Sequence, residues 1–381
     1  MNTYDIIIIW WWASGLFCSA FLPKGAKKCI LEKSEKLWTK LLLSGWERCN
    51  VTNTQLDPSC YVGQNTKMLP SVFHHRSQQD MIDFLQGHGV ETVVEDHGRV
   101  LLKSGKAKEL LELLTHLAHE NDTEIFLNQN VLGIWNLSAG IGYCPPDKQI
   151  PDKLINHFSD KTFCHDWYQF VVWTNDITLC AKNIIIASGG MTYPQVGASA
   201  FGYEIAEQLW LEIVAPHGAL CGIETHEETS ALAGSTVQTW ITLYHDNKIV
   251  YKNAWSLLFT HRGVSGPIIF DATLHIDQDI SKYSFQLEFD LSATSKKVVQ
   301  AFKLVAWDTQ RDFRLKAVRP ISEAKVSVGG ILLRELDQHF QSRKIPGLYF
   351  IGEALDITGK TGGYNLQRAW SSAYVCAEGM K

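Results

Sequence analysis

The sequence lacks several features that would place it outside the ordinary intracellular proteins. No apolar run reaches the roughly 18 residues of a membrane span, and the first nine residues have neither the basic stretch nor the cleavage site of a signal peptide. There is no CxxC pair, and an odd number of cysteines, nine, indicates reduced thiols. These absences predict a cytoplasmic protein with no membrane partner.

A strongly basic stretch is also missing from the pattern of charges. Lys and Arg number 35 against 40 Asp and Glu, which gives a net charge of -5. Because nucleic acids are polyanions that need a basic face, composition predicts no nucleic acid as a partner. We expect a small-molecule substrate. The 381 residues, 45% hydrophobic and 20% charged, are typical of a globular chain of two or three domains. Nothing in the composition sets the oligomeric state.

The N-terminal segment has the pattern of parallel strands joined by a helix. Asp5 to Ile9 is a fully apolar strand, residues 13–21 can form a short helix, and "KKCILEKS" is a second strand that ends on Glu32. Together they make a βαβ unit of about 30 residues. Helical spacing recurs at 78–89 and 106–120, and further strands lie in 123–134 and 169–190, on either side of a polar excursion at about 140–166.

The texture of the sequence changes near residue 195. From there to about 340, short runs such as "TWITLYHDNKIVYKN" alternate polar and apolar residues, which indicates an antiparallel, partly barrel-like domain. From Gly347, "GLYFIGEALD" restores the buried-strand pattern of the first domain, and a helix closes the chain. We therefore predict a discontinuous first domain, 1–194 with 341–381, and an inserted β-rich domain at 195–340.

The turn after the first strand has the layout of the dinucleotide-binding fingerprint G-x-G-x-x-G, but not its first two glycines. Trp10, Trp11 and Trp12 occupy the turn, and only the third glycine is present, as Gly15. Glu32 stands where that motif has an acidic residue for the ribose hydroxyls. On this stretch alone, an ordinary βαβ unit with a surface glutamate explains the residues equally well.

Further segments, in order along nearly the whole chain, resemble one family. They are "KLLLSGWERCNVTN" (40–53), "VEDHGRV" (94–100), "IIIASGGMTYPQVG" (184–197), "LLFTHRGVSGP" (257–267), "AKVSVGGI" (324–331) and "GLYFIGEALDITGKTGGYNLQRAWSSAYV" (347–375). The chain resembles the BaiN/RdsA-type, or aminoacetone-oxidase-like, NAD(P)/FAD-dependent oxidoreductases. The resemblance implies an α/β fold, a two-dinucleotide-type FAD-binding Rossmann-like domain with an inserted β-rich, barrel-like domain. It also implies FAD as cofactor, hydride transfer through the flavin, and NAD(P)H as a possible reductant.

The resemblance also implies where FAD would lie. Glu32 would hold the adenosine ribose, the Val131 backbone would meet the adenine, and the turn with Ala187 and Gly189 would pass close to the cofactor. Further residues would contact the ribityl-pyrophosphate and the isoalloxazine or wrap the cofactor: Gly15, Lys40, Ser44, Arg48, Asn50, Gly352, Glu353, Gly363, Tyr364, Asn365 and Leu366. A helix that starts at "TGGYN" would present backbone N–H groups beside the flavin. His261 is a weak candidate for a substrate-binding group or proton donor, with a packing role at least as well supported.

The chain departs from the family by placing tryptophan at glycine positions. The family pattern "GGGASG" is "WWWASG" here, and Trp38, Trp46, Trp210 and Trp255 also stand where glycine is usual. This recurrence favours engineered or computationally altered positions over natural drift. The segment between "FDLS" and "FRLKAVRP" is also shorter than in family members.

The tryptophans predict loss of the cofactor. A pyrophosphate binds against bare backbone N–H groups at the helix N-terminus, so indoles at Trp10, Trp12 and Trp46 would obstruct it. We therefore predict an oxidoreductase scaffold in which FAD binding and catalysis are abolished or strongly impaired. Two alternatives stay open: an active flavoenzyme whose turn has rearranged, and a flavin-free binding protein with an apolar Trp surface.

Overall fold

The computed structural model describes residues 2–10, 13–35, 40–45, 48–146, 148, 150, 154 and 168–381. Trp11, Trp12, Trp38, Trp46 and most of the excursion at 140–166 lie outside these residues. The chain forms two compact units. The first comprises Met1–Gly190, Pro194–Ala215 and Gly329–Lys381, and the second comprises Met191–Tyr193 and Pro216–Val328.

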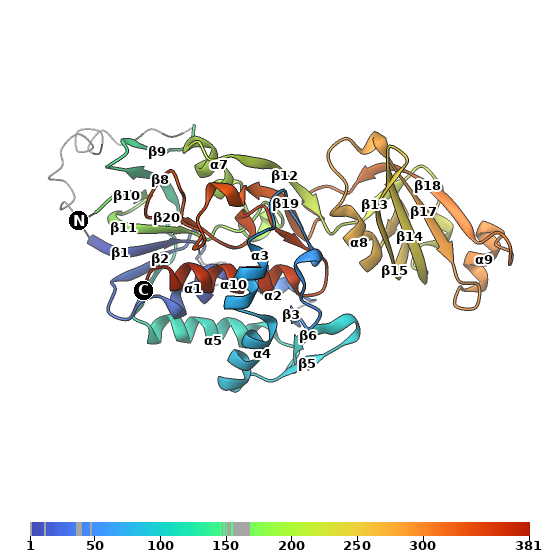
Figure 1. Ribbon diagram of the computed structural model, residues 1–381, viewed down its shortest axis with the longest axis horizontal. Helices are drawn as coiled ribbons and strands as arrows, with labels where there is room; N and C mark the ends of the chain where they lie inside the picture. The colour runs from blue at the N-terminus through green and yellow to red at the C-terminus, as the bar shows by residue number, and fades with distance from the viewer. Residues whose placement is uncertain are drawn as a thin grey trace. The chain divides into compact units, whose positions relative to one another are not determined.

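An eight-stranded sheet forms the centre of the first unit (Figure 1). The strand order is β7-β2-β1-β11-β10-β8-β9, and β20 also pairs with β11. The strands are β1 (Asn2–Ile9), β2 (Lys28–Leu31), β7 (Thr123–Phe126), β8 (Val131–Asn136), β9 (Ile141–Tyr143), β10 (Phe170–Thr174), β11 (Thr178–Ile186) and β20 (Leu348–Phe350). Strands β7, β2, β1, β11 and β20 run parallel, whereas β10, β8 and β9 add antiparallel pairs. The strand near the C-terminus therefore lies in the sheet that contains Ile6–Ile9.

Helices cover this sheet because its strands are apolar on both faces. The helices of the unit are α1 (Ala13–Phe21), α2 (Lys40–Leu43), α3 (Leu69–His75), α4 (Gln78–Gly87), α5 (Ala107–Glu120), α7 (Phe201–Gln208) and α10 (Tyr364–Glu378). Helix α1 packs between α10 and α5, and the rings of Phe17 and Trp370 lie 5.2 Å apart. Smaller sheets are β3 (Asn50–Asn53) with β6 (Arg99–Leu102) and β5 (Thr92–Val94), and β4 (Tyr61–Val62) with β21 (Thr358–Gly359). Within the described residues, no helix has the length and apolar character needed to cross a membrane.

The second unit is built on a closed barrel. Its strand order is β13 (Ile223–Thr225), β16 (Gly263–Ser265), β15 (Lys248–Thr260), β14 (Thr236–His245), β17 (Tyr283–Phe289) and β18 (Gln310–Val318), and β13 pairs with β18 to close it. Alternate residues face the interior, where Phe285 and Phe313 stack with ring centres 5.1 Å apart. Helices α8 (Pro267–Thr273) and α9 (Lys296–Phe302) belong to this unit, and β12 (Ile213–Ala219) and β19 (Val326–Ile331) pair where the chain enters and leaves it. The predicted fold class, a Rossmann-like α/β domain with a barrel-like insertion, is confirmed.

Short 3-10 helices complete the element list. They span Pro58–Cys60, Asp96–Gly98, Pro194–Val196, Ser230–Leu232, Ile280–Lys282, Leu333–Glu335 and Gly352–Ala354.

The first unit extends further than residue 194, where the sequence places the domain boundary. Helix α7 packs on the first sheet, since an added Cβ at Gly202 would lie 2.4 Å from Ser188 Oγ and 3.4 Å from Ile186. The sequence marks the change of texture but not this helix, whose amphipathic pattern is short. Apart from Met191–Tyr193, the chain leaves the first unit at Ala215 and re-enters it at Gly329.

The odd number of cysteines predicted reduced thiols throughout, but the structure does not agree at every cysteine. Seven cysteines are free: Cys18, Cys29, Cys49, Cys60, Cys144, Cys221 and Cys376. Cys180, by contrast, is disulfide-bonded. Counting residues cannot reveal such a pairing, because it depends on which side chains the fold brings together.

Helix α7 ends in a geometry that normally requires glycine. The N–H of Trp210 donates to the Glu207 carbonyl at 3.0 Å and that of Leu211 to the Ala206 carbonyl at 2.8 Å, a Schellman motif. Trp210 holds the left-handed position of this motif, with φ 61°, and its side chain is 76% exposed. The family resemblance places a glycine here, and the backbone conformation agrees with that residue type.

We expect Trp210→Gly to raise the free energy of unfolding by about 1 kcal/mol, because strain is relieved and little apolar contact is lost. Urea denaturation measures this. Trp240→Gly is the matched control: Trp240 lies in β14 and is 50% exposed, so glycine there should lower stability. A loss of stability in both variants would contradict the strain argument.

Candidate cofactor site

The turn between β1 and α1 keeps the backbone that a glycine would adopt. Trp10 follows Ile9 with φ 66°, and its N–H donates to the Leu31 carbonyl at 2.9 Å. Helix α1 then begins at Ala13. At Gly15, an added Cβ would lie 2.6 Å from the Trp10 carbonyl oxygen and 3.1 Å from the Ala187 Cβ, so α1 and β1 approach too closely for a side chain. Gly15 therefore has the packing role of the third fingerprint glycine.

The indole of Trp10 points into the protein. It is 2% exposed, stacks on Phe201 with ring centres 4.7 Å apart, and lies under Lys33, whose Nζ is 4.1 Å from the ring centre. Burial lowers the pKa of Lys33, and the Glu32 carboxylate opposes this shift. The indole Nε1 has no hydrogen-bond partner among the described residues. The side chain thus fills buried space beside the turn without satisfying its own donor.

Of the residues expected near the adenosine end, Glu32 and Ala187 lie at the carboxyl ends of sheet strands, whereas Val131 lies at the start of one. Glu32 follows β2, is 4% exposed, and accepts a hydrogen bond from the Ser34 N–H at 2.8 Å. Val131 begins β8 and is buried. Ala187 follows β11, and its N–H donates to the Ile9 carbonyl at 3.0 Å, while Gly189 has φ 71°. The carboxyl ends of parallel strands are where such folds bind ligands, so the arrangement supports these positions, although their contact with FAD stays a prediction.

The loop before α10 is fixed by its own polar groups. Gly363, with φ 103°, is the N-cap of α10, and an added Cβ would lie 2.2 Å from the Thr52 carbonyl oxygen. The Asn365 amide accepts from the Gly359 N–H at 3.0 Å and donates to the Gly359 carbonyl at 2.7 Å. The Asn50 amide, in the orientation that satisfies both of its ends, accepts from the Gly363 N–H at 3.2 Å. Tyr364 is buried and Leu366 half-buried at the start of the helix.

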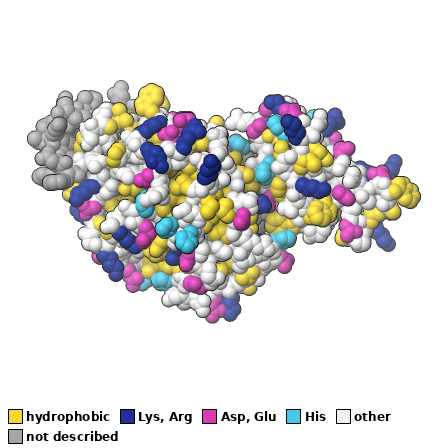
Figure 2. All heavy atoms as spheres, viewed as in Figure 1, with side chains coloured by type: hydrophobic (Ala, Val, Ile, Leu, Met, Phe, Trp, Pro, Cys, Tyr) yellow, Lys and Arg dark blue, Asp and Glu magenta, His cyan; other side chains and the backbone are white. Residues whose placement is uncertain are grey.

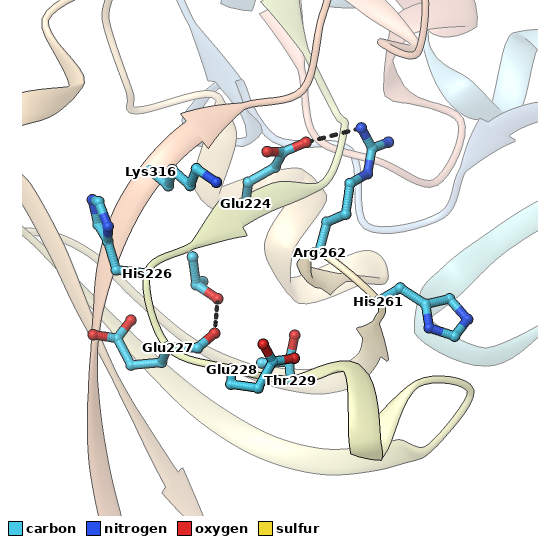
Figure 3. A pocket seen from close by; sticks show the side chains of 9 residues that line it. Glu224, His226, Glu227, Glu228, Thr229, His261, Arg262 and Lys316 are labelled. Atoms are coloured by element: carbon cyan, nitrogen blue, oxygen red, sulfur yellow. Dashed lines mark hydrogen bonds and ion pairs between the residues drawn. The ribbon is translucent and has the colours of Figure 1, made fainter.

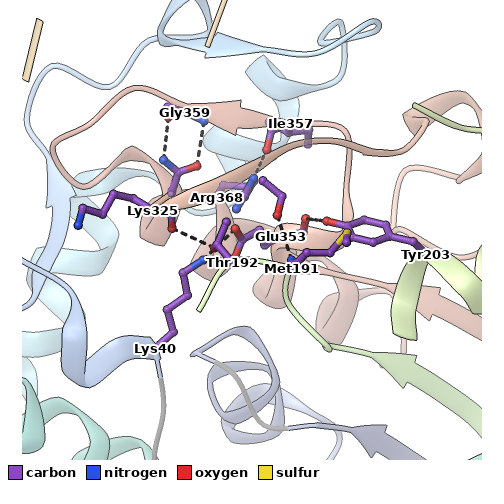
Figure 4. Close-up of polar contacts among 11 residues, drawn as sticks. Lys40, Met191, Thr192, Tyr203, Lys325, Glu353, Ile357, Gly359 and Arg368 are labelled. Atoms are coloured by element: carbon purple, nitrogen blue, oxygen red, sulfur yellow. Dashed lines mark hydrogen bonds and ion pairs between the residues drawn. The ribbon is translucent and has the colours of Figure 1, made fainter. Parts of the chain in front are cut away.

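Lys40, Ser44 and Arg48, which are predicted to wrap the cofactor, bind different partners in the structure. Lys40 Nζ lies 2.9 Å from both carboxylate oxygens of Glu353 (Figure 4). Arg48, in contrast, pairs with Glu95, and the Ser44 hydroxyl donates to the Leu41 carbonyl at 2.6 Å. Of these residues, Lys40 therefore lies against Glu353, next to Gly352, whereas Arg48 forms its ion pair with Glu95.

Two buried charged groups near Glu353 escaped the sequence reasoning. Arg368 on α10 is 3% exposed, donates to the Ile357 carbonyl, and has no partner for Nε within the described part of the chain. Burial lowers its pKa, and the Glu353 carboxylate opposes this. Asp356 is also 3% exposed and accepts the Gln64 N–H at 2.8 Å. A basic residue within "NLQRAWSSAYV" was the available signal for Arg368, since the rest of that helix face is apolar or small.

Stability should depend on pH through Asp356. Burial raises the pKa of its carboxyl above 3.8, so the folded protein binds this proton more tightly than the unfolded chain does. The stability that protonated Asp356 contributes is therefore lost as the pH rises through the pKa of the folded state. We expect the melting temperature of Asp356→Asn, relative to that of the parent, to increase as the pH rises above 3.8.

Asp290→Asn is the control of opposite sign. Hydrogen bonds from Ser292 lower the pKa of Asp290, so its contribution is present above the unfolded pKa and lost as pH falls through the folded pKa. The loss of melting temperature in Asp290→Asn relative to the parent should therefore be largest at neutral pH. A difference between parent and Asp356→Asn that does not change with pH would contradict the argument.

His261 lies in the second unit, in the wall of a hollow of about 290 Å³ (Figure 3). The hollow is lined by Glu224, Thr225, His226, Glu227, Glu228, Thr229, His261, Arg262 and Lys316. Arg262 pairs with Glu224 at 3.0 Å, and Glu227 holds Arg314 at 3.2 Å. The lining of the hollow is polar and contains both positive and negative side chains. Whether His261 meets a flavin or substrate stays a prediction.

Solved structures share the fold at low sequence identity. The 3-ketosteroid-delta4-(5alpha)-dehydrogenase of Rhodococcus jostii aligns with 100% of this chain and 96% of its own, with TM-score 0.54 and 11% identity. A likeness of this kind shows the fold alone.

Two curated proteins are similar along almost the full chain. The ribosomal RNA dihydrouridine synthase of Escherichia coli (strain K12) is 28% identical over 99% of this chain and 98% of its own. The 3-dehydro-bile acid delta(4,6)-reductase of Clostridium scindens is 22% identical over 92% and 91%. The prediction that nucleic acid is excluded as a partner is wrong, since the first of these proteins is an enzyme of ribosomal RNA. The error came from using net charge, a whole-chain average, to exclude a local surface.

The family assignment covers most of the sequence. The HI0933-like protein Rossmann domain matches residues 4–143 and 157–379. Those ranges include the β1–α1 turn, the loop before α10 and the barrel unit. This chain belongs to the HI0933-like family of FAD-binding Rossmann proteins, the coarser form of the resemblance found in the sequence.

Proposed function

We propose that this chain is the scaffold of an FAD-dependent reductase of uridine in RNA, with its cofactor site closed by tryptophan. The substrate class rests on the Escherichia coli relative, whose name implies a reduction because dihydrouridine carries two more hydrogens than uridine. The BaiN/RdsA-type resemblance of the sequence agrees with this class. NAD(P)H as the source of the electrons and a cytoplasmic location stay predictions.

The observation that carries the closed site is the buried indole of Trp10. A pyrophosphate would need the bare backbone of the turn, and the packing of the indole between Phe201 and Lys33 supports a site that does not fit it. Truncation of a buried Trp costs about 3–5 kcal/mol, so moving this side chain aside would take much of the binding free energy of a cofactor. We derive no catalytic step through FAD in this chain.

The structure bears differently on the two alternatives. A rearranged turn would be expected to leave the glycine-type conformation, yet Trp10 keeps φ 66°. A Trp-lined contact surface would need exposed indoles, yet Trp10 is 2% exposed. Trp11 and Trp12 lie outside the described residues and stay open in this respect.

Purification and FAD titration test the proposal. We expect a colourless protein that does not quench flavin fluorescence and does not reduce uridine in an RNA oligonucleotide with FAD and NADPH. A yellow protein that retains flavin through gel filtration would overturn the closed site but leave the substrate class intact. Reduction of a steroid or bile acid, and not of RNA, by a glycine-restored variant would overturn the substrate class.

A further inference from the structure

Basic residues are concentrated in one segment of the barrel unit. Residues 296–319 contain seven Lys or Arg and two Asp or Glu, a net charge of +5, while the other 357 residues contain 28 and 38, a net charge of -10. This segment forms α9, the turn that follows it, and β18. The chain thus has a local basic surface that its net charge conceals.

Strand β18 carries these charges along the outside of the barrel. Phe313 and Leu315 are buried in the barrel core, so Arg314 and Lys316 point outward. Lys316 reaches the hollow that His226 and His261 also line (Figure 3). From Gln310 to Lys316 the strand spans roughly 20 Å at about 3.3 Å per residue, which is long enough to follow several nucleotides.

Four lysines of this segment are available to a partner. Lys296, Lys297, Lys303 and Lys316 are exposed. In the part of the chain that the structure describes, their ammonium groups form no ion pair. The arginines are already engaged: Arg311 with Asp308 at 2.6 Å, Arg314 with Glu227 at 3.2 Å, and Arg319 with Glu323 at 3.1 Å. Arginine therefore neutralises Asp308, Glu227 and Glu323, whereas Asp312 accepts a hydrogen bond from the Gln286 amide. The charges of the four lysines are not used in these pairs.

An exposed tryptophan lies in the turn between α9 and β18, four residues after Lys303. Trp307 is 88% exposed, and its turn is closed by the Val305 N–H on the Asp308 carbonyl at 3.2 Å and the reverse bond at 2.9 Å. At the α9 end of the second unit, hydrophobic side chains and Lys or Arg side chains lie next to one another (Figure 2). An aromatic ring held on a closed turn between cations is the arrangement by which proteins bind single-stranded nucleic acid, through stacking and phosphate contacts.

We propose that the face formed by Lys296, Lys297, Lys303, Trp307 and Lys316 binds single-stranded RNA. This rests on the proposed function, because it supplies the place where the RNA around the target uridine is held. The lysines contact phosphates, and the Trp307 indole stacks on a base. The binding is independent of FAD and therefore survives in a chain whose cofactor site is closed.

Fluorescence anisotropy with the full chain and a labelled single-stranded ribosomal RNA oligonucleotide tests this face. Changing the four lysines to Gln should weaken binding at least tenfold and reduce the slope of log affinity against log salt by about three, since each phosphate contact contributes about 0.7. Trp307→Ala should weaken binding about tenfold. The matched control changes Lys24, Lys67, Lys106 and Lys108, exposed lysines of the first unit, to Gln and should leave most of the affinity.

The outcomes separate this proposal from the one it rests on. If the parent chain binds RNA and the four-lysine variant binds it equally, or the control loses as much, the face is overturned and the RNA substrate stands. If the parent chain binds no RNA, the RNA substrate is overturned together with the face. FAD affinity is measured separately and bears on neither result.

Discussion

Replacing Trp10, Trp12 and Trp46 together by glycine is expected to restore FAD binding, with a gain in affinity of at least about a hundredfold. The rest of the predicted site keeps its backbone arrangement: Gly15 allows α1 to pack on β1, and the buried Glu32 follows β2. Trp12 and Trp46 lie outside the described residues, and they are included in the variant because the family has glycine at these positions.

The size of this effect follows from Trp10. Removing the indole frees the space between Phe201 and Lys33, so FAD binding no longer requires a buried Trp side chain to be displaced at a cost of about 3–5 kcal/mol. Each 1.4 kcal/mol is a factor of about ten in affinity, so we expect a gain in FAD affinity of about a hundredfold to a thousandfold. Trp12→Gly alone should be insufficient, because the Trp10 indole would stay in place.

Titration of both proteins with FAD, followed by quenching of flavin fluorescence, measures the gain, and circular dichroism checks that both are folded. Trp210→Gly is the matched control: it also removes a tryptophan at positive φ, with φ 61°, but at an exposed helix end. It should stabilise the chain and leave FAD affinity unchanged. Equal affinity in the parent and the triple variant would show that the turn accommodates FAD around its indoles.

The sequence predicted those parts of the fold that depend on local pattern. Helix α1 has the predicted bounds, residues 13–21, because apolar spacing and the third fingerprint glycine both lie within it. The run of four isoleucines predicted a central strand, and β1 has parallel neighbours on both sides. The alternating texture after residue 195 predicted a β-rich insertion, and six strands close into a barrel there.

Features that depend on distant contacts were beyond the sequence. Closure of the barrel pairs Ile223 with Val318, nearly a hundred residues away. The sequence indicated that Trp10 was misplaced, but not that its indole turns inward onto Phe201, which belongs to a helix far along the chain. Arg48 is predicted to contact the cofactor, and the sequence did not indicate that its side chain pairs with Glu95. In each case the deciding contact joins residues that no local pattern connects.

Glu353→Gln is expected to lower the free energy of unfolding by about 3 kcal/mol, because it removes the carboxylate that pairs with the partly buried Lys40 ammonium and whose negative charge favours the buried Arg368 cation. The Glu353 carboxylate is 10% exposed and lies 2.9 Å from Lys40 Nζ, whose side chain is 17% exposed. It also opposes the lowering of the pKa of Arg368 by burial. Urea denaturation measures the loss, and near-ultraviolet circular dichroism checks that the variant is folded.

A double variant separates the two cations. Lys40→Met in the Glu353→Gln background removes the Lys40 charge as well and should recover part of the lost stability, since a buried pair replaced by apolar groups is often nearly neutral. The remaining deficit then belongs to Arg368, which keeps its contact with the Ile357 carbonyl. Glu91→Gln at the exposed Lys103 pair is the matched control and should change stability little, because solvent screens that pair. If Glu353→Gln were as mild as this control, or if Lys40→Met deepened its loss, the carboxylate would not be the group that compensates these charges, and its place beside Gly352 would then be explained by hydrogen bonding alone.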